Sequence, residues 1–391
     1  MDLLFDSAAH EFRAEVRGWL AENVPTEPLS SMDSAEGFEQ HRRWERQMAD
    51  ARMSVVSWPV EFGGRDAPLL HWLIFEEEYY RSGAPGRVSQ NGIFLLAPTL
   101  FEHAHPEQLA RIMPRMARSD DIWGQAWSEP GAGSDLASLR STATRTDGGW
   151  LLNGQKTWSS RSSFADWGFG LFRSDPDSAR HKGITYFMFD LRTDGVTVRP
   201  INQLDGEPGF AELFLENVFV PDDPDAPSES GVIGAVNNGW KVAMSTAANE
   251  RGLSLRSPGR FLATTDRLLA LWNDTDASAR KGFGDQVADA WIGARAYELS
   301  TYATVSRLAE GGQLGMESSI NKVFWSQWDI STHETALDLL GTDAELAQRQ
   351  PSGDWMDGYL FSLSGPIYAG TNEIQRNVIA ERLLGLPRGD R

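Results

Sequence analysis

The chain has 391 residues, of which 41% are hydrophobic and 23% charged, and this composition is typical of a folded protein of two or three domains. Its formal net charge of -19 excludes nucleic acid and anionic membrane surfaces as natural partners, and the lack of cysteine excludes disulfides, thiolate catalysis and cysteine-ligated metals. No apolar run approaches the length of a membrane helix, and the acidic start lacks the basic region of a signal peptide, so we expect a cytoplasmic protein.

The first part of the chain has apolar residues at helical spacing. Residues 12–20 place their apolar side chains on one face of an opening helix that Pro25 should end. Residues 73–80 mark another helix before the turn-forming sequence at 82–86. We therefore predict an N-terminal helical domain over residues 1–120.

The pattern then changes to short runs rich in β-branched and aromatic residues. Such runs occur at 149–154, 184–189, 196–198 and 213–215, and turn-forming residues separate them. Several short strands at about ten-residue spacing are typical of a small sandwich or barrel. The sequence thus predicts a middle β domain over residues 121–228, closed by a loop rich in Asp, Pro and Ser.

Helical patterns return in the last part of the chain, which we assign to a C-terminal helical domain over residues 229–391. The last helix should open after Thr371, a residue type that caps helices, and end near Gly385. An earlier helix carries five residues on one side: Ala288, Ile292, Arg295, Ala296 and Leu299. The predicted fold class is therefore α+β, mostly α, with helices first, a β-sandwich or barrel next, and helices last.

A loop at the entrance to the β region, residues 127–135, concentrates hydroxyl groups and glycine. Its flexible backbone can direct N–H and O–H groups at a planar, hydrogen-bonding ring system. A glycine-rich turn between two domains would have the same composition. The loop by itself therefore leaves both interpretations open.

Two further segments have compositions typical of ligand contacts. Residues 154–160 place Trp158 beside two hydroxyl residues, which suits the flank of an aromatic cofactor or, equally, a tryptophan half-buried where domains meet. Residues 367–376 place Gly370 and Thr371 at a helix start, where exposed N–H groups stabilise negative charge. A helix cap without a ligand is the alternative for that segment.

Taken together and in this order, the three segments resemble the signatures of the acyl-CoA dehydrogenase family. The resemblance extends over nearly the whole chain and includes residues 58–64 and 217–221. It implies an N-terminal helical domain, a middle β domain and a C-terminal four-helix bundle, with FAD bound between the last two. It also implies that the enzyme introduces a 2,3-double bond into an acyl thioester and uses no metal.

The resemblance assigns roles residue by residue. The segment from Gln125 to Ser128 corresponds to the one that contacts the flavin ring, Trp158 to the residue packed against it, and Ser160 to the hydroxyl near flavin N5. The implied cofactor-binding residues are Gln125, Ala126, Trp127, Ser128, Trp158, Ser159, Ser160, Arg280, Thr371, Asn372 and Glu373. The implied substrate-binding residues are Ser134, Arg251, Ala369 and Gly370.

The catalytic base is the main departure from the common family pattern. Many members carry a glutamate immediately before the Gly-Thr pair of the third segment, where this chain has Ala369, which cannot accept a proton. Isovaleryl-CoA and long-chain acyl-CoA dehydrogenases are similar in placing the base on an earlier helix, just before an arginine. Residues 249–252 match that position, so Glu250 is the expected base and Arg251 its support. An exposed Glu–Arg pair on a helix is the alternative.

The chemistry needs one carboxylate whose pKa lies near the working pH, because the α-proton of a thioester is only weakly acidic. Burial in an apolar pocket raises the pKa of a glutamate in that direction. The developing enolate oxygen also needs donors that are fixed in advance. The family uses a backbone N–H at the position of Ala369, which survives the change to alanine. Hydride from the β-carbon then passes to flavin N5.

A second departure concerns the far end of FAD. Residues 280–284 resemble a family Arg-x-x-Phe-Gly motif whose arginine, here Arg280, reaches the cofactor of a neighbouring subunit. A family Gln-x-x-Gly-Gly motif corresponds to residues 338–342, with Asp338 and Thr342 in place of the Gln and the last Gly. An aspartate repels a pyrophosphate, so the adenine half of the site departs from the family pattern.

Three functions stay open at this level. Besides an active dehydrogenase, the chain could be a non-catalytic subunit that stabilises a partner dehydrogenase, or an acyl-CoA oxidase-like flavoenzyme. The expected substrate is an acyl-CoA or a carrier-protein thioester, and the expected acceptor is an electron-transfer flavoprotein. We expect a homo-oligomer, dimer or tetramer, or a hetero-oligomer with a homologous subunit that completes the FAD site.

Overall fold

The computed structural model describes residues 5–251, 257–312, 315, 317–346 and 352–388. Side chains are described for all of these except residues 248–251, 317, 352 and 353. The chain forms two compact units. The helical unit consists of residues 1–24, 68–84 and 251–391, and the sheet unit consists of residues 25–67 and 85–250.

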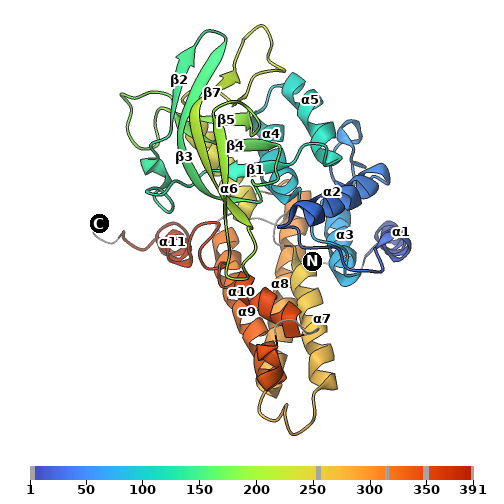
Figure 1. Cartoon of the computed structure of the whole chain (residues 1–391). Helices are drawn as coiled ribbons and strands as arrows, with labels where there is room; N and C mark the ends of the chain where they lie inside the picture. Colours follow the sequence, from blue (N-terminus) through green and yellow to red (C-terminus); the bar gives the residue numbers. More distant parts are fainter. Residues whose placement is uncertain (1–4, 252–256, 313–314, 316, 347–351, 389–391) are drawn as a thin grey trace. The chain divides into compact units, whose positions relative to one another are not determined.

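Most of the described chain lies in regular elements (Figure 1). The α-helices are α1 (Ser7–Asn23), α2 (Ala35–Asp50), α3 (Leu69–Arg81), α4 (Ala97–His103), α5 (Pro106–Ala117), α6 (Gly239–Arg251), α7 (Pro258–Asp274), α8 (Gly284–Ala309), α9 (Glu317–Leu340), α10 (Ser352–Ser362) and α11 (Asn372–Val378). The strands are β1 (Trp123–Ala126), β2 (Thr142–Thr146), β3 (Gly149–Ser160), β4 (Trp167–Arg173), β5 (Ile184–Asp190), β6 (Val196–Ile201), β7 (Phe210–Pro221) and β8 (Val232–Ile233). Among the described helices, none combines the length and apolar character needed to cross a membrane.

The opening helix α1 forms where the sequence predicts it. Asp6 caps its start with a side-chain oxygen that accepts a backbone N–H, and the helix ends before Pro25, because a proline cannot continue the hydrogen-bond pattern. The predicted apolar face is buried at Phe12, Val16 and Leu20. In the helical unit this face packs on α3, which in turn packs on α7.

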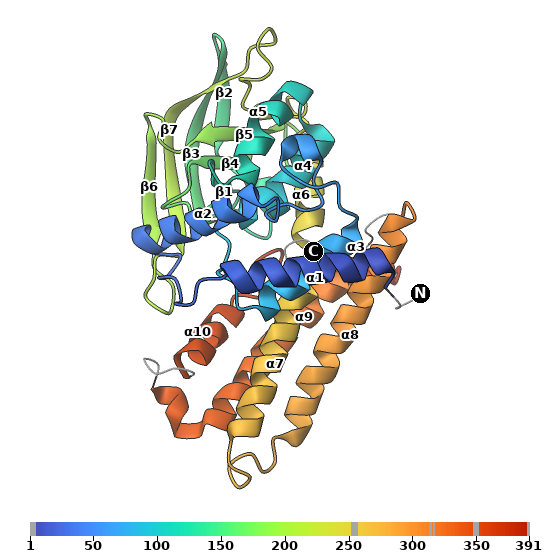
Figure 2. The same cartoon turned by 90° about the vertical axis from the view of Figure 1, so that its right-hand side faces the viewer.

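The C-terminal helices pack around an aromatic core. Helices α7 and α8 form a hairpin and lie side by side (Figure 2), and α9 packs against both. Helices α10 and α11 pack against α9. The core between α7, α8 and α9 contains Phe261, Tyr297, Trp325 and Trp328. This arrangement agrees with the predicted C-terminal helical bundle.

Helix α8 buries a different side from the one that the sequence pattern emphasised. Its buried residues include Val287, Ala290, Ala294 and Tyr297. The apolar residues named from the sequence face outward instead, since Ile292 is 56% exposed and Leu299 is 44% exposed. An apolar stripe that no part of the described chain covers thus runs along α8.

All eight strands belong to one sheet with the order β6-β7-β3-β2-β4-β5-β8, and β1 pairs with β4 off this path. The long antiparallel ladder between β3 and β7 and the ladder between β4 and β5 dominate it. Strand β1 runs parallel to β4, so the chain enters the sheet at an inner position. This is the middle β domain that the sequence predicts.

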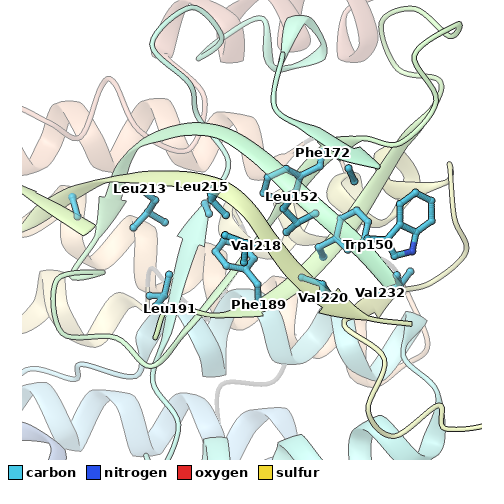
Figure 3. Packing of buried hydrophobic residues seen from close by; sticks show 14 residues of the cluster. Trp150, Leu152, Phe172, Phe189, Leu191, Leu213, Leu215, Val218, Val220 and Val232 are labelled. Carbon is cyan, nitrogen blue, oxygen red and sulfur yellow. The ribbon is translucent and has the colours of Figure 1, made fainter. Parts of the chain in front are cut away.

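The sheet curls around its own core. Strands β3 and β5 are not neighbours in the sheet order, yet the rings of Trp150 and Phe187 meet edge to face with centroids 5.7 Å apart. Figure 3 shows Leu152 and Leu213 among the side chains that gather between the curled strands. Because the sheet curls, the strands turn one face toward this core and the other away from it. The curl agrees with the expected sandwich or barrel.

Strand β3 is longer than the sequence predicts. The sequence predicts a turn near Gly154, but the strand continues through it to Ser160, and its pairing with β7 shifts in register there. Gly154 has φ of 144°, and a Cβ there would lie 2.2 Å from Oγ of Ser141. The glycine therefore serves close strand packing rather than a chain reversal.

Candidate cofactor site

A bulge in β3 turns Trp158 out of the sheet. The register shifts between Lys156 and Ser159, and Trp158 takes a left-handed backbone with φ of 60°. Its side chain is 60% exposed, and its ring meets Phe210 edge to face with centroids 6.0 Å apart. A large aromatic ring held at the surface by a strand bulge offers a face on which a flat ring system can stack.

The end of β1 and this bulge are joined by a backbone hydrogen bond. The N–H of Thr157 donates to the carbonyl of Ser128 at 2.9 Å. Two of the three sequence segments therefore meet in the sheet unit. Gln125, Ser128 and Ser160 are partly exposed in this unit, so their amide and hydroxyl groups are accessible to a ligand.

Three predicted site residues in the same unit have other surroundings. The side chain of Ser159 is fully buried and Trp127 is 8% exposed, so we expect any contact of theirs with a ligand to come through the backbone. Ser134 is exposed in the loop that follows β1. The hydroxyl-rich loop thus divides into a buried anchor and a part that is open to solvent.

A buried ion pair fastens this loop to the sheet. Nζ of Lys156 lies 2.8 Å from Oε1 of Glu129, and it also donates to the carbonyl of Leu171 at 2.7 Å. The Glu129 carboxylate accepts the backbone N–H groups of Arg140 at 2.6 Å and Ser141 at 3.0 Å. Glu129 and Lys156 thus hold the loop after β1 against β3, two residues from Trp158.

Glu129 and Lys156 are not among the site residues that the sequence predicts. No local signal marks them, because each lies in a polar, turn-forming segment. Burial lowers the pKa of Lys156, and the neighbouring carboxylate opposes that change. For Glu129, burial acts to raise the pKa, but the attraction of Lys156 and the hydrogen bonds from Lys156, Ser141 and Arg140 together outweigh it, so the net pKa is lowered.

The third segment forms a tight turn in the helical unit. Ala369 and Gly370 both have a left-handed backbone, with φ of 57° and 78°. Thr371 then caps α11, since its side chain accepts the N–H of Ile374 at 3.3 Å. The predicted N-cap is confirmed. The amide of Gln375 donates to the carbonyl of Ala369 at 3.1 Å and so closes the turn.

The first residues of α11 divide between the interior and solvent. Asn372 is buried, and its Oδ1 accepts hydrogen bonds from Nζ of Lys322 at 2.8 Å and from Oγ of Ser326 at 3.1 Å. Glu373 is exposed, and hydrogen bonds from its own backbone N–H and from Thr371 lower its pKa. Lys322 and Gln375 were not found from the sequence, because each reads as an ordinary helix residue.

The residues predicted for the far end of the cofactor lie within the helical unit. Nη1 of Arg280 donates to the carbonyl of Trp272 at 3.1 Å, and its guanidinium lies 5.2 Å from the centroid of the Trp272 ring. Asp338 and Thr342 are exposed at the end of α9 and in the turn after it. The aspartate is therefore open to solvent rather than paired in the core.

The predicted base lies at the edge of what the structure describes. Glu250 and Arg251 belong to the last turn of α6, and their side chains fall outside the described residues. The backbone alone agrees with the expectation that the base is carried by a helix that follows the sheet.

Comparison with known families covers nearly the whole chain. Models of the acyl-CoA dehydrogenase N-terminal, middle and C-terminal domains match residues 6–120, 124–218 and 237–384. The chain belongs to the acyl-CoA dehydrogenase family. Members of this family are oxidoreductases that use FAD.

Relatives of known name support this placement. Acyl-CoA dehydrogenase IpdE1 of Mycolicibacterium smegmatis is 38% identical over 97% of this chain and 98% of its own. The ChsE4-ChsE5 complex of Mycobacterium tuberculosis has a TM-score of 0.82 at 27% identity, covering all of both chains. A structure described as the Tcur3481-Tcur3483 steroid ACAD has a TM-score of 0.84 at 23% identity, again over all of both chains, and shares the fold.

The residues of this acyl-CoA dehydrogenase fit the family cofactor. Trp158 presents a ring face for the flavin, and Ser128 and Ser160 present hydroxyl groups for its polar edge. In the helical unit, Thr371 at the start of α11 is partly exposed and follows the left-handed turn at Ala369 and Gly370. The family resemblance assigns the residues named in each unit to FAD binding.

Proposed function

We propose that the chain catalyses FAD-dependent α,β-dehydrogenation of an acyl-CoA to the 2,3-enoyl thioester, with Glu250 as the base. The family match over all three domains supports the reaction class. This match is the single observation that carries the proposal, because it covers the order and the length of the domains in addition to the short motifs.

The position of the base follows from two residues. Ala369 offers only a methyl group where many relatives carry the carboxylate, so the proton acceptor must come from elsewhere. Glu250 stands near the end of α6, where a branch of the family places it. Its carboxylate would accept the α-proton, and Arg251 beside it would favour the ionised form.

The remaining steps are carried by groups that are fixed in advance. The backbone N–H of Ala369 would donate to the thioester oxygen as negative charge develops there. Trp158 and the hydroxyls of Ser128 and Ser160 would orient the flavin. Bound FAD supplies the hydride acceptor for the β-hydrogen.

Anaerobic mixing with acyl-CoAs tests the reaction. The purified enzyme should carry FAD, and straight, branched and ring-bearing acyl-CoAs are mixed with it in turn. At least one should bleach the flavin absorbance and yield the 2,3-enoyl-CoA, identified by mass spectrometry. Folded, FAD-loaded protein that none of them bleaches would contradict the proposal. Rapid reoxidation by oxygen after bleaching would favour the oxidase alternative, and reoxidation by an electron-transfer flavoprotein the dehydrogenase.

Replacement of the base is the sharper test. In Glu250→Gln the shape is kept and the proton acceptor is lost, so flavin bleaching should slow by at least about 100-fold while FAD stays bound. Glu229→Gln, at an exposed position of the sheet unit, is the matched control and should bleach at the wild-type rate. A near-normal rate in Glu250→Gln would remove Glu250 from the mechanism.

A second candidate function is that of one subunit in a hetero-oligomeric dehydrogenase. Two observations favour it: a structural relative is a complex named for two components, and Asp338 and Thr342 depart from the family pattern where a partner would meet FAD. In such an assembly this chain would bring the base and the partner would complete the adenine half of the site. FAD counting per chain, alone and after co-expression with a homologous subunit, separates the two arrangements.

A further inference from the structure

The turn that carries Ala369 needs support from outside itself. Ala369 and Gly370 are consecutive left-handed residues, and a residue with a Cβ is less stable in that conformation than glycine. Gln375 secures one side of the turn by donating to the carbonyls of Ala369 and Gly370 at 3.1 and 3.4 Å. The other side depends on Asn372, the first residue of α11.

Asn372 is held by two donors from α9. Its Oδ1 accepts from Nζ of Lys322 at 2.8 Å and from Oγ of Ser326 at 3.1 Å. Its backbone N–H donates to the carbonyl of Pro366 at 2.9 Å, which closes the chain on the far side of the turn. Asn372 therefore ties the turn to α9 by its side chain and to the preceding loop by its backbone.

Lys322 lies in the interior of the helical unit. Its side chain is fully buried, and Nζ lies 5.9 Å from the centroid of the Trp325 ring. Ser326 is one helical turn along the same face of α9 and is also fully buried. Removing an ammonium from water is unfavourable, whereas an apolar residue at this position would pack without that penalty. If position 322 served only to fill the core of the helical unit, an apolar residue would suffice there.

We infer that Lys322 is a positioning residue for the dehydrogenation, acting through Asn372 to fix the turn that holds the N–H of Ala369. The inference rests on the proposed function, in which that N–H donates to the thioester oxygen. Such a donor lowers the barrier only if it is in place before charge develops, and displacements of about 1 Å are enough to matter. Lys322 touches the turn through Asn372 rather than the reacting atoms.

Three variants and a control test this inference on the FAD-loaded enzyme. Lys322→Met removes the ammonium and keeps the chain length, and Lys322→Arg keeps a cation. Ser326→Ala removes the weaker donor and is the mild variant if Lys322→Met fails to fold. Lys182→Met, which removes an exposed lysine from the sheet unit, controls for the change in net charge.

The first readout is kinetic and uses the acyl-CoA that bleaches wild-type flavin fastest. Lys322→Met should slow the limiting bleaching rate by at least about tenfold, with half-saturation within about twofold of wild type. Lys322→Arg should recover part of the rate, Ser326→Ala should lie between wild type and Lys322→Met, and Lys182→Met should match wild type. If Lys322→Met loses FAD and thermal stability but bleaches at the wild-type rate per bound FAD, its role is only structural and the inference is wrong.

The second readout does not depend on activity. Hydrogen–deuterium exchange should accelerate in Lys322→Met at the backbone N–H groups of residues 369–372, while the core of α8 stays protected. Unchanged exchange in the turn would overturn the inference. Failure of the proposed function would give a different result from failure of this inference. In that case none of the acyl-CoAs would bleach the flavin of the wild-type enzyme, and the positioning role would be wrong as well.

Discussion

Trp158 owes its place at the surface to the backbone rather than to its own polarity. An indole of this size is normally buried in a sheet, and here a left-handed residue in a ladder bulge turns it outward so that 60% of it is exposed. The energetic cost of that exposure falls away if a flat ring covers the indole. A bound flavin would provide such a ring.

We therefore expect Trp158→Ala to weaken FAD binding without unfolding the protein. Loss of one aromatic stacking contact is worth about 1–3 kcal/mol, so the dissociation constant of FAD should rise by about fivefold or more. Titration of the apoprotein with FAD, followed by fluorescence, measures this change.

Phe219→Ala provides the matched comparison for that titration. Phe219 is an aromatic residue of the same sheet and is 45% exposed, but it lies on β7 and outside the predicted site. Its removal should leave FAD affinity unchanged. Equal weakening by both substitutions would mean that Trp158 acts through the stability of the sheet and not through the cofactor.

At the scale of elements, the pair of Glu129 and Lys156 joins the loop after β1 to β3. The loop brings hydroxyl groups and the strand brings the tryptophan, so the ion pair sets their spacing. Both side chains are almost fully shielded, which protects the attraction from salt but requires both charges to be present.

The lowered pKa of Glu129 makes this junction sensitive to acid. The unfolded chain binds the proton more readily than the folded one between the lowered pKa and the ordinary carboxyl value of 4.5. The contribution of Glu129 to the free energy of unfolding is thus fully present above pH 4.5, and it is lost as the pH falls through the lowered pKa. Each unit of lowering corresponds to about 1.4 kcal/mol.

The double variant Glu129→Gln/Lys156→Met isolates this contribution, because it removes both charges and leaves none unpaired. The wild-type protein should lose free energy of unfolding relative to the double variant as pH falls from about 6 to about 3. Urea unfolding at several pH values measures the difference. A difference that stays constant over this range would show that Glu129 does not titrate as described.

At the scale of the whole molecule, the apolar stripe on α8 is the strongest sign of assembly. An apolar groove of about 500 Å³ between α7 and α8 adjoins it and is lined by Trp272, Trp291 and Ile292, among others. Along the stripe, small and large residues alternate in an order that is the same in either direction: Ala288, Ile292, Ala296, Leu299 and Ala303. Such a helix face suits antiparallel pairing with a second copy, or with a homologous chain that shares the pattern.

We therefore predict an oligomer that depends on this stripe. Light scattering should give at least twice the mass of one chain for the wild-type protein. Ile292→Glu/Leu299→Glu should lower that mass, because charges cannot be buried unpaired in an apolar interface. Replacement of the exposed Leu204 by Glu in the sheet unit is the control and should change nothing. A wild-type monomer with a full complement of FAD would contradict the prediction.

The amino-acid sequence by itself determined the order of the helical and β regions and a few element ends, such as that of α1 before Pro25. Helical spacing, strand-like runs and breakers such as Pro25 act over a few residues, so they can be read without the fold. The cap at Thr371 is of the same kind. The family signatures identified Trp158 and Ser128 as site candidates, because each lies within a short segment of fixed order.

The tertiary structure decided which side of each element is covered and which distant groups meet. The bulge at Trp158 exists only through the register of β3 against β7, and the outward stripe of α8 only because α7 and α9 cover its other side. Glu129 and Lys156 become a pair because the loop after β1 folds back on β3. Lys322 gains a role only where α11 begins beside α9. Contacts between residues far apart in the chain leave no local pattern, so only the folded molecule reveals them.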